Sequence, residues 1–554
     1  MTVFLGLVIG LFVTMALIPA LVRFSGNLQL LDHPNDRKVH SEPIPRIGGI
    51  AVFVGTILPL MLSVLSDQAV QFYIMGALLI VLFGALDDRF DINFKWKFLG
   101  QSVAVVVAMS YGVRIESLPF FGLGPLPDWV SLPLTFVFIL GVTNAINLSD
   151  GLDGLAGGTS LISLGCIAAL AYAAGGFPVA LAAAALIGAI LGFLRFNTHP
   201  AVIFLGDAGS QFLGFSLAVL SLTLVNDINS ALNPLFPVLL MGLPLMDTLS
   251  VVVLRLKNRG SPFKADKNHF HHRLLGIGMR HYEAVSTAYF LQVVIIGLAF
   301  LTRYQSDALV ILLFLGLFAG IFGGLSFLEK TGWRLHPELE GQARTIEGGA
   351  SSSSFGLERR NQWLRRVSWL PNRSVQTVQY GISFFLIAGA VCTSAPDREI
   401  PMVAALTVVI MVAAHFLLHN WTGIFTRLGV YVLGIFVVFL LAPLTEANPA
   451  LDWAVNAFFL LLTVILALAI RLTRRETFQI TPQDLLMLLI VLAVPLLPLG
   501  GFFQYPIGSL VLRAAVVFYA CEYILNRGDF SYRLLRLSAI GGLCVMAAKG
   551  ILIL

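Results

Sequence analysis

Runs of about 20 apolar residues recur along the whole chain, and each is long enough as a helix to cross roughly 30 Å of hydrocarbon. Backbone polar groups in lipid need internal partners, so such runs must be helical. The chain is 57% hydrophobic and only 12% charged, which excludes an ordinary soluble domain. We therefore predict an all-α, polytopic integral membrane protein.

The apolar runs form two groups, about eleven and about seven, separated by a hydrophilic stretch. In the first group we predict spans at 2–23, 47–66, 70–86, 98–113, 130–144, 157–175, 177–195, 207–225, 232–254, 284–302 and 307–327. In the second we predict spans at 377–394, 401–419, 424–443, 451–470, 484–499, 507–525 and 534–554. The stretch between them contains Gly349–Ser354, a composition typical of flexible linkers. We predict domains at 1–328 and 377–554, joined by a cytoplasmic linker at 329–376.

Lysine and arginine are distributed unevenly between alternate loops, which predicts an N-terminus outside the cell and the linker inside. The first apolar run lacks a basic leader and a clear cleavage site, so we interpret it as a retained helix. The formal charge of +5 is modest for 554 residues and gives no case for nucleic acid. With this orientation, five separate polar clusters fall on the cytoplasmic side.

The densest polar cluster lies at 141–158 and contains Asn144, Asn147, Asp150 and Asp153, followed by glycines. Residues spaced by three share a drifting face of a helix. Amides and carboxylates together can bind a nucleobase and sugar or ligate a metal. An interhelical polar seam is the structural alternative, because membrane bundles use such seams as well.

A second cluster places Asp87 and Asp88 at the end of an apolar span. Negative charge is unfavourable at a helix C-terminus, so adjacent aspartates there indicate a function. Paired carboxylates suit a divalent cation or phosphate chemistry that needs one. Lys95 and Lys97 follow closely, and either could reach a phosphate as a point charge.

Two further clusters are weaker when taken alone. Asp207 lies between glycines at the start of a span, where helix capping is a competing explanation. The loop at 32–49 is polar and basic, includes Arg46, and could attract an anionic substrate or headgroup. Ordinary positive-inside charge explains that loop equally well.

The last cluster contains His269, His271, His272 and Arg273 in a basic loop. No cysteine or carboxylate stands at zinc-ligand spacing beside them, so phosphate contact or acid–base chemistry is the better interpretation. Asp247 falls inside a predicted span and needs a partner that the sequence does not identify.

The polar side chains together indicate phosphoryl transfer between a soluble anionic donor and a lipid acceptor. A transporter or translocase of lipid-linked sugars is the alternative from another class. It should show mid-membrane polar residues and repeat symmetry, and neither is clear here.

Five stretches occur in this order: LDDRFDI, NAINLSDGLDGLAGG, FLGDAGSQFLGF, PLMDTLSVVVLRL and HFHHRL. Because of these five stretches and their order, roughly the first 330 residues resemble the polyprenyl-phosphate N-acetylhexosamine-1-phosphate transferase family. The resemblance ends near Leu328, and the C-terminal domain has no assigned role.

The resemblance implies ten or eleven membrane helices and an active site on the cytoplasmic face of a bacterial inner membrane. It implies that a UDP-N-acetylhexosamine and polyprenyl phosphate react to give a lipid diphosphate sugar and UMP, with Mg²⁺ or Mn²⁺. A homodimer is one candidate assembly. HFHHRL interrupts the three consecutive histidines of phospho-N-acetylmuramoyl-pentapeptide transferase, so the branch using UDP-N-acetylglucosamine is favoured and the other is the alternative.

The resemblance also implies residue roles. Asp207 would be the principal metal ligand, with Asp150 sharing the metal. Asp87 and Asp88 would contact the metal or the lipid phosphate. Nucleotide or other substrate contacts would come from Asn147, Asp150, Asp153, Lys97 (with Lys95 as an alternative), Arg46 and Arg273. The diphosphate or sugar would be met by His269, His271 and His272.

Asp87 is often proposed as a base in this family. A phosphate monoester, however, has a second pKa near 6 and is largely dianionic at neutral pH. We therefore favour positioning and electrostatics for Asp87.

Overall fold

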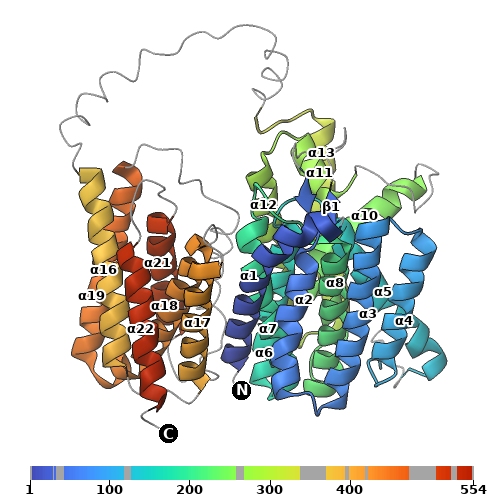
Figure 1. Cartoon of the computed structure of the whole chain (residues 1–554). Helices are drawn as coiled ribbons and strands as arrows, with labels where there is room; N and C mark the ends of the chain where they lie inside the picture. Colours follow the sequence, from blue (N-terminus) through green and yellow to red (C-terminus); the bar gives the residue numbers. More distant parts are fainter. Residues whose placement is uncertain are drawn as a thin grey trace. The chain divides into compact units, whose positions relative to one another are not determined.

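The computed structural model describes residues 3–28, 30–32, 43–117, 126–257, 268–336, 370–393, 399–417, 422–472, 507–525 and 533–551. Almost all of these residues are helical, and 11 helices are long and apolar enough to cross a membrane. The predicted all-α polytopic class is therefore confirmed. The described helices separate into two compact units, α1–α13 and α16–α22 (Figure 1). The domain boundaries at 328 and 377 themselves stay a prediction.

The first unit is a helical bundle with one short pair of strands. Its helices are α1 (Val3–Leu28), α2 (Gly48–Ser63), α3 (Gln68–Phe90), α4 (Phe94–Met109), α5 (Asp128–Ser149), α6 (Leu155–Ala173), α7 (Phe177–Asn197), α8 (Gly206–Thr223), α9 (Phe236–Leu240), α10 (Gly242–Lys257), α11 (Phe270–Gly276), α12 (His281–Thr302) and α13 (Asp307–Lys330). A π-helical turn, η2 (Leu224–Ile228), continues α8. Strands β1 (Leu31–Asp32) and β2 (Ile44–Pro45) pair antiparallel.

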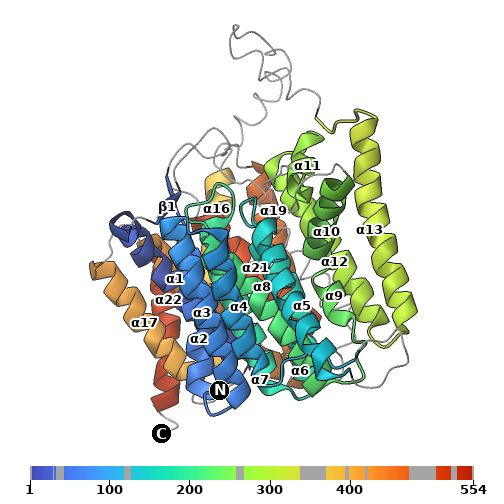
Figure 2. The ribbon, with the colours of Figure 1, turned by 90° about the vertical axis from the view of Figure 1, so that its right-hand side faces the viewer.

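Helix α8 forms the centre of this unit. Every side chain from Ala208 to Leu222 is buried, as expected for a helix that is apolar on all faces. It packs against α2, α3, α5 and α6. In Figure 2, α13 lies at the edge of the unit, and only 17% of its apolar window is buried. The N-terminus of α8 lies near the ends of α3, α4 and α5.

A chain of amides crosses the bundle beside α8. Asn144 donates to the Oε1 of Gln101 at 2.9 Å, and Gln101 in turn donates to the Oε1 of Gln211 at 2.9 Å. These bonds join α5, α4 and α8, so Asn144 belongs to an interhelical polar seam. The contacts of Asn144 thus favour the interhelical polar seam over ligand binding.

The predicted span at 232–254 is wrong as a single helix, because two helices, α9 and α10, cover it. Met241 separates them, and Pro244 falls in the first turn of α10, where a missing N–H costs little. The predicted span at 484–499 lies outside the described residues.

The second unit contains α16 (Leu370–Cys392), α17 (Glu399–Leu417), α18 (Thr422–Ala447), α19 (Pro449–Leu472), α21 (Ile507–Leu525) and α22 (Arg533–Ile551). Helix α18 packs against each of the other five described helices. Three of the candidate spans belong to this unit, and their ranges are Val375–Cys392, Phe425–Ala447 and Pro449–Ala469.

Candidate active site

Four polar side chains from four helix ends, two aspartates, one lysine and one asparagine, form a cluster. The Lys97 ammonium donates to Asp207 Oδ2 at 2.5 Å and pairs with Asp87 Oδ2 at 2.9 Å. Asn147 donates to Asp207 Oδ1 at 2.7 Å. Lys97 is 22% exposed, whereas Lys95 is exposed and makes none of these contacts. The structure therefore distinguishes Lys97 from Lys95. We call Asp87, Lys97, Asn147 and Asp207 the acidic–lysine cluster.

Asp88 caps helix α8 from a neighbouring helix. Its two oxygens accept the backbone N–H groups of Asp207 at 2.9 Å and Ala208 at 3.0 Å. Gly206 has φ +72°, and a Cβ there would lie 2.6 Å from Asp88 Oδ2. The helix cap that was the competing explanation for Asp207 is thus supplied by Asp88, which leaves the Asp207 side chain for the cluster.

Asp150 ends α5 and lies near several other carboxylates. Its pKa is raised to about 7, first by burial and then by the negative charges of Asp207, Asp153 and Asp88, whereas Arg46 opposes the shift. Such an excess of negative charge favours the binding of a cation.

Asp153 lies apart from the acidic–lysine cluster, beside two histidines. Its Oδ2 is 2.7 Å from His199 Nδ1 and accepts from the N–H of Ala201 at 3.2 Å. His281 Nε2 is 3.4 Å from the Asp153 carbonyl, and the two imidazoles stack with centroids 4.1 Å apart. Ligand atoms of these three side chains lie within 4.8 Å of one another, a spacing that could hold a metal ion.

Asp247 obtains the partner that its position requires. Its Oδ2 is 3.0 Å from His269 Nδ1, and its Oδ1 accepts the Phe270 N–H at 2.7 Å. Both His269 and Asp247 are buried. His269 is therefore fixed against α10 and starts α11.

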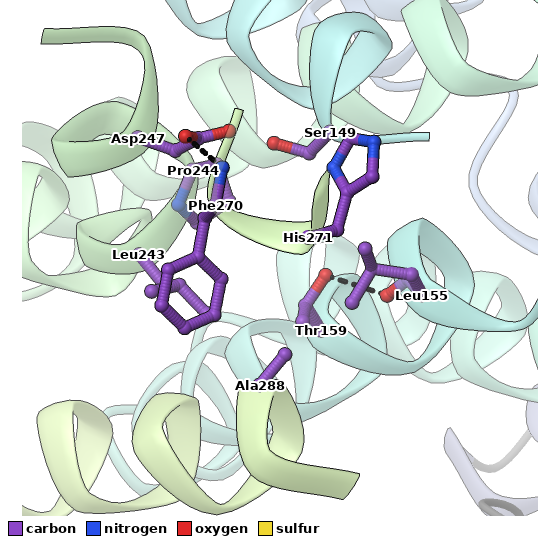
Figure 3. A pocket seen from close by; sticks show the side chains of 9 residues that line it. All are labelled: Ser149, Leu155, Thr159, Leu243, Pro244, Asp247, Phe270, His271 and Ala288. Carbon is purple, nitrogen blue, oxygen red and sulfur yellow. Dashed lines mark hydrogen bonds between the residues drawn. The ribbon is translucent and has the colours of Figure 1, made fainter. Parts of the chain in front are cut away.

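His271 is in α11, and its ring packs against the end of α5 beside Ser149 (Figure 3). Its ring packs so closely on Gly151 that a Cβ there would be 2.1 Å from Nε2. A cavity of 20 Å³, about the size of one water, lies beside it and Ser149. The pKa of His271 is lowered to about 3, by burial first and then by His272 and His269, so the imidazole is neutral at physiological pH. His272 is exposed.

The two predicted arginines have carboxylate partners. Arg46 pairs with Asp32 beside the β1–β2 strand pair. Arg273 is 8% exposed and holds Glu329 of α13 through two bonds of 2.8 and 2.6 Å. Arg46 therefore borders the site, whereas Arg273 joins α11 to α13.

Three polar residues beside the site were not predicted from sequence, namely Asn197, His199 and His281. Asn197 accepts the Gly154 N–H at 2.8 Å and donates to the Ile203 carbonyl at 2.9 Å, so it holds two motif segments together. Only their positions could have indicated them from the sequence. Asn197 ends α7, His199 follows it and His281 starts α12, all on the side that carries the other polar clusters.

The acidic–lysine cluster lies in a segment that matches a known protein family. Residues 70–225 match the family described as glycosyl transferase family 4. This range contains the four members of the acidic–lysine cluster together with Asp88, Asp150 and Asp153.

Individual relatives are similar over about half of this chain. A probable undecaprenyl-phosphate N-acetylglucosaminyl 1-phosphate transferase of Bacillus subtilis is 36% identical over 51% of this chain and 80% of its own. An undecaprenyl-phosphate alpha-N-acetylglucosaminyl 1-phosphate transferase of Yersinia pestis is 32% identical, covering 55% and 86%. A decaprenyl-phosphate N-acetylglucosaminephosphotransferase of Mycolicibacterium smegmatis is 35% identical, covering 46% and 71%.

Proposed function

The chain belongs to glycosyl transferase family 4, and on this premise we propose that it transfers N-acetylglucosamine 1-phosphate to a polyprenyl phosphate. The names of the relatives support both the sugar and the lipid. We propose a UDP-sugar as donor. An oxygen of the lipid phosphate attacks the sugar-bound phosphorus, the bond from that phosphorus to the UMP oxygen breaks, and UMP leaves.

The observation that carries this proposal is the acidic–lysine cluster. It joins the ends of α3, α4, α5 and α8, which are distant in sequence, through bonds of 2.5 to 2.9 Å. Phosphoryl transfer needs positioned charge more than it needs a covalent group from the protein. Positive inside loops support a site on the cytoplasmic face.

The residues fit a divalent cation, which we propose to be Mg²⁺ or Mn²⁺. Carboxylate oxygens are the ligands that Mg²⁺ prefers. Among the residues that the structure describes, four carboxylates lie near only two cationic side chains, and one of these two already pairs with Asp32. The carboxylates are Asp87, Asp88, Asp150 and Asp207, and the cations are Lys97 and Arg46. Asp88 is committed to capping, so we propose Asp207 and Asp150 as ligands. The bound cation would offset charge on the diphosphate.

The side chains divide between the two substrates. We propose that Asp87 and Lys97 position the lipid phosphate and that Asn147 and Asp153 contact the nucleotide. The neutral His271 can donate or accept one hydrogen bond to the diphosphate or sugar, and His269 orients its segment through Asp247. We propose that the exposed His272 contacts the same substrate groups.

The direct test uses the purified full chain with undecaprenyl phosphate, Mg²⁺ and a panel of UDP-sugars, measuring UMP. We expect UMP release with UDP-N-acetylglucosamine, and none without the lipid. Release with UDP-N-acetylmuramoyl-pentapeptide alone would move the chain to the other branch. No release with any sugar would leave a transporter as the better hypothesis.

Asp87→Asn is expected to lower the rate about 10- to 100-fold at every pH from 6 to 9, because the acceptor phosphate is already ionised over most of this range. The measurement is UMP release against pH. Asp67→Asn, at the other end of α3, is the control, since asparagine also caps a helix well. A defect that disappears at high pH would instead identify Asp87 as a base.

Gly151→Ala is expected to lower UMP release about 100-fold, because a Cβ 2.1 Å from His271 Nε2 displaces the imidazole. Gly141→Ala on α5 is the matched control, because nothing lies within 4 Å of its added Cβ. Equal rates for the two variants would remove His271 from the site.

As the pH is raised toward 7, affinity for Mn²⁺ is expected to increase by up to about tenfold per pH unit. Above pH 7 the affinity should level off. The pKa of Asp150 is raised to about 7, so a proton competes with the cation until the pH exceeds that value. Electron paramagnetic resonance of free Mn²⁺ measures the affinity without substrate. Asp150→Asn should flatten the slope, and an unchanged slope in this variant would exclude Asp150 as its source.

A further inference from the structure

The second unit contains a polar cavity of 320 Å³ where α18 ends and where α19 and α21 begin. This volume is within the range of small-molecule sites. The polar residues that line it in the described part of the chain are Thr445, Glu446, Asp452, Asn456, Ser509 and Arg513. All of these residues belong to one unit, so the cavity is independent of the acidic–lysine cluster and of the proposed reaction.

Arg513 is the buried group around which the cavity is built. It is 4% exposed, and one Nη donates to Asp452 Oδ1 at 2.6 Å and to Asn456 Oδ1 at 2.7 Å. Its Nε is buried and has no hydrogen-bond partner among the described residues. An orphaned buried donor is costly, particularly in a membrane bundle, unless an acceptor reaches it. An acceptor on a ligand in the cavity would satisfy this donor.

The charges restrict what that ligand can be. Among the described residues, two carboxylates, Glu446 and Asp452, line the cavity together with the guanidinium of Arg513. The net charge of about −1 on these described residues disfavours an anion. A hydrocarbon chain would leave Arg513 Nε without an acceptor. A neutral molecule with several hydroxyl groups supplies acceptors for Arg513 Nε and donors for the carboxylates.

The position of the cavity agrees with such a ligand. Trp453 follows Asp452 and is 75% exposed, as is typical of tryptophan at a membrane–water interface. A cavity at the membrane–water interface can be reached by free sugars in solution and by the sugar headgroups of lipids. We propose that this cavity is a binding site for a neutral saccharide.

The test uses the full chain in lipid nanodiscs and saturation-transfer NMR with free N-acetylglucosamine and glucose. Arg513→Gln is expected to abolish the cavity-dependent signal, and Asn456→Ala to weaken the affinity about three- to tenfold. Arg533→Gln on α22, an exposed arginine, is the matched control and should bind like the unmodified protein. Monoglucosyldiacylglycerol in the nanodisc forms a second arm, and its displacement of the free sugar would identify a headgroup as the source.

Asn456→Ala keeps the Arg513–Asp452 pair and changes an exposed side chain, so it remains informative if Arg513→Gln fails to fold. UMP release by Asn456→Ala should be unchanged, which separates this proposal from the transferase proposal. Sugar binding that is equal in Asn456→Ala, Arg533→Gln and the unmodified protein would overturn the site. Binding of inorganic phosphate that depends on Asn456 would replace the saccharide with an anion.

Discussion

Asp207→Asn is expected to lower UMP release by on the order of a thousandfold, a larger effect than we expect from any other substitution at this site. Asp207 accepts from Lys97 at 2.5 Å and from Asn147 at 2.7 Å, and it is one of the two proposed metal ligands. Asparagine keeps the shape of the side chain but removes the charge that Lys97 and a cation require. The rate at saturating UDP-N-acetylglucosamine measures the loss.

Asp67→Asn again provides the matched control, because it makes the same chemical change on α3 far from the cluster. The protein should retain its unfolding temperature in both variants. A rate for Asp207→Asn within tenfold of the unmodified protein would contradict the assignment of Asp207 as principal ligand.

Lys97→Gln is expected to change two properties in opposite directions. Its ammonium lies 2.5 Å from Asp207 Oδ2 and 2.9 Å from Asp87 Oδ2, where it repels an incoming cation. Removing it should raise Mn²⁺ affinity several-fold and lower turnover about 100-fold, because the lipid phosphate loses a positive charge. Mn²⁺ titration and UMP release measure the two effects.

Lys95→Gln, two residues earlier and exposed, should leave both properties unchanged. A parallel loss of Mn²⁺ affinity and turnover in Lys97→Gln would indicate a damaged fold. Unchanged turnover would remove Lys97 from substrate positioning.

Most of the first unit could be predicted from sequence because hydrophobic length alone determines a membrane helix. The exception at 232–254 shows the limit of that criterion. Apolar composition cannot distinguish one long helix from two short ones, and the break between α9 and α10 occurs in an apolar segment near prolines.

The residue types of the candidate site could also be predicted, but their pairing could not. Lys97 and Asp207 are 110 positions apart, and no local pattern joins them. The same holds for Asp88, whose task of capping α8 depends on a contact 119 residues away. Asp247 was recognised as needing a partner, and only the fold identifies His269. His199 and His281 belong to no recognised motif, and only the fold brings them beside Asp153.

The capping of α8 by Asp88 has a consequence for inhibitor design. The first free N–H groups of a helix ordinarily attract phosphates, but here Asp88 already occupies those of Asp207 and Ala208. A compound that mimics the diphosphate therefore gains little from this helix end. A cationic or metal-chelating group in place of the diphosphate should bind better than an additional negative charge.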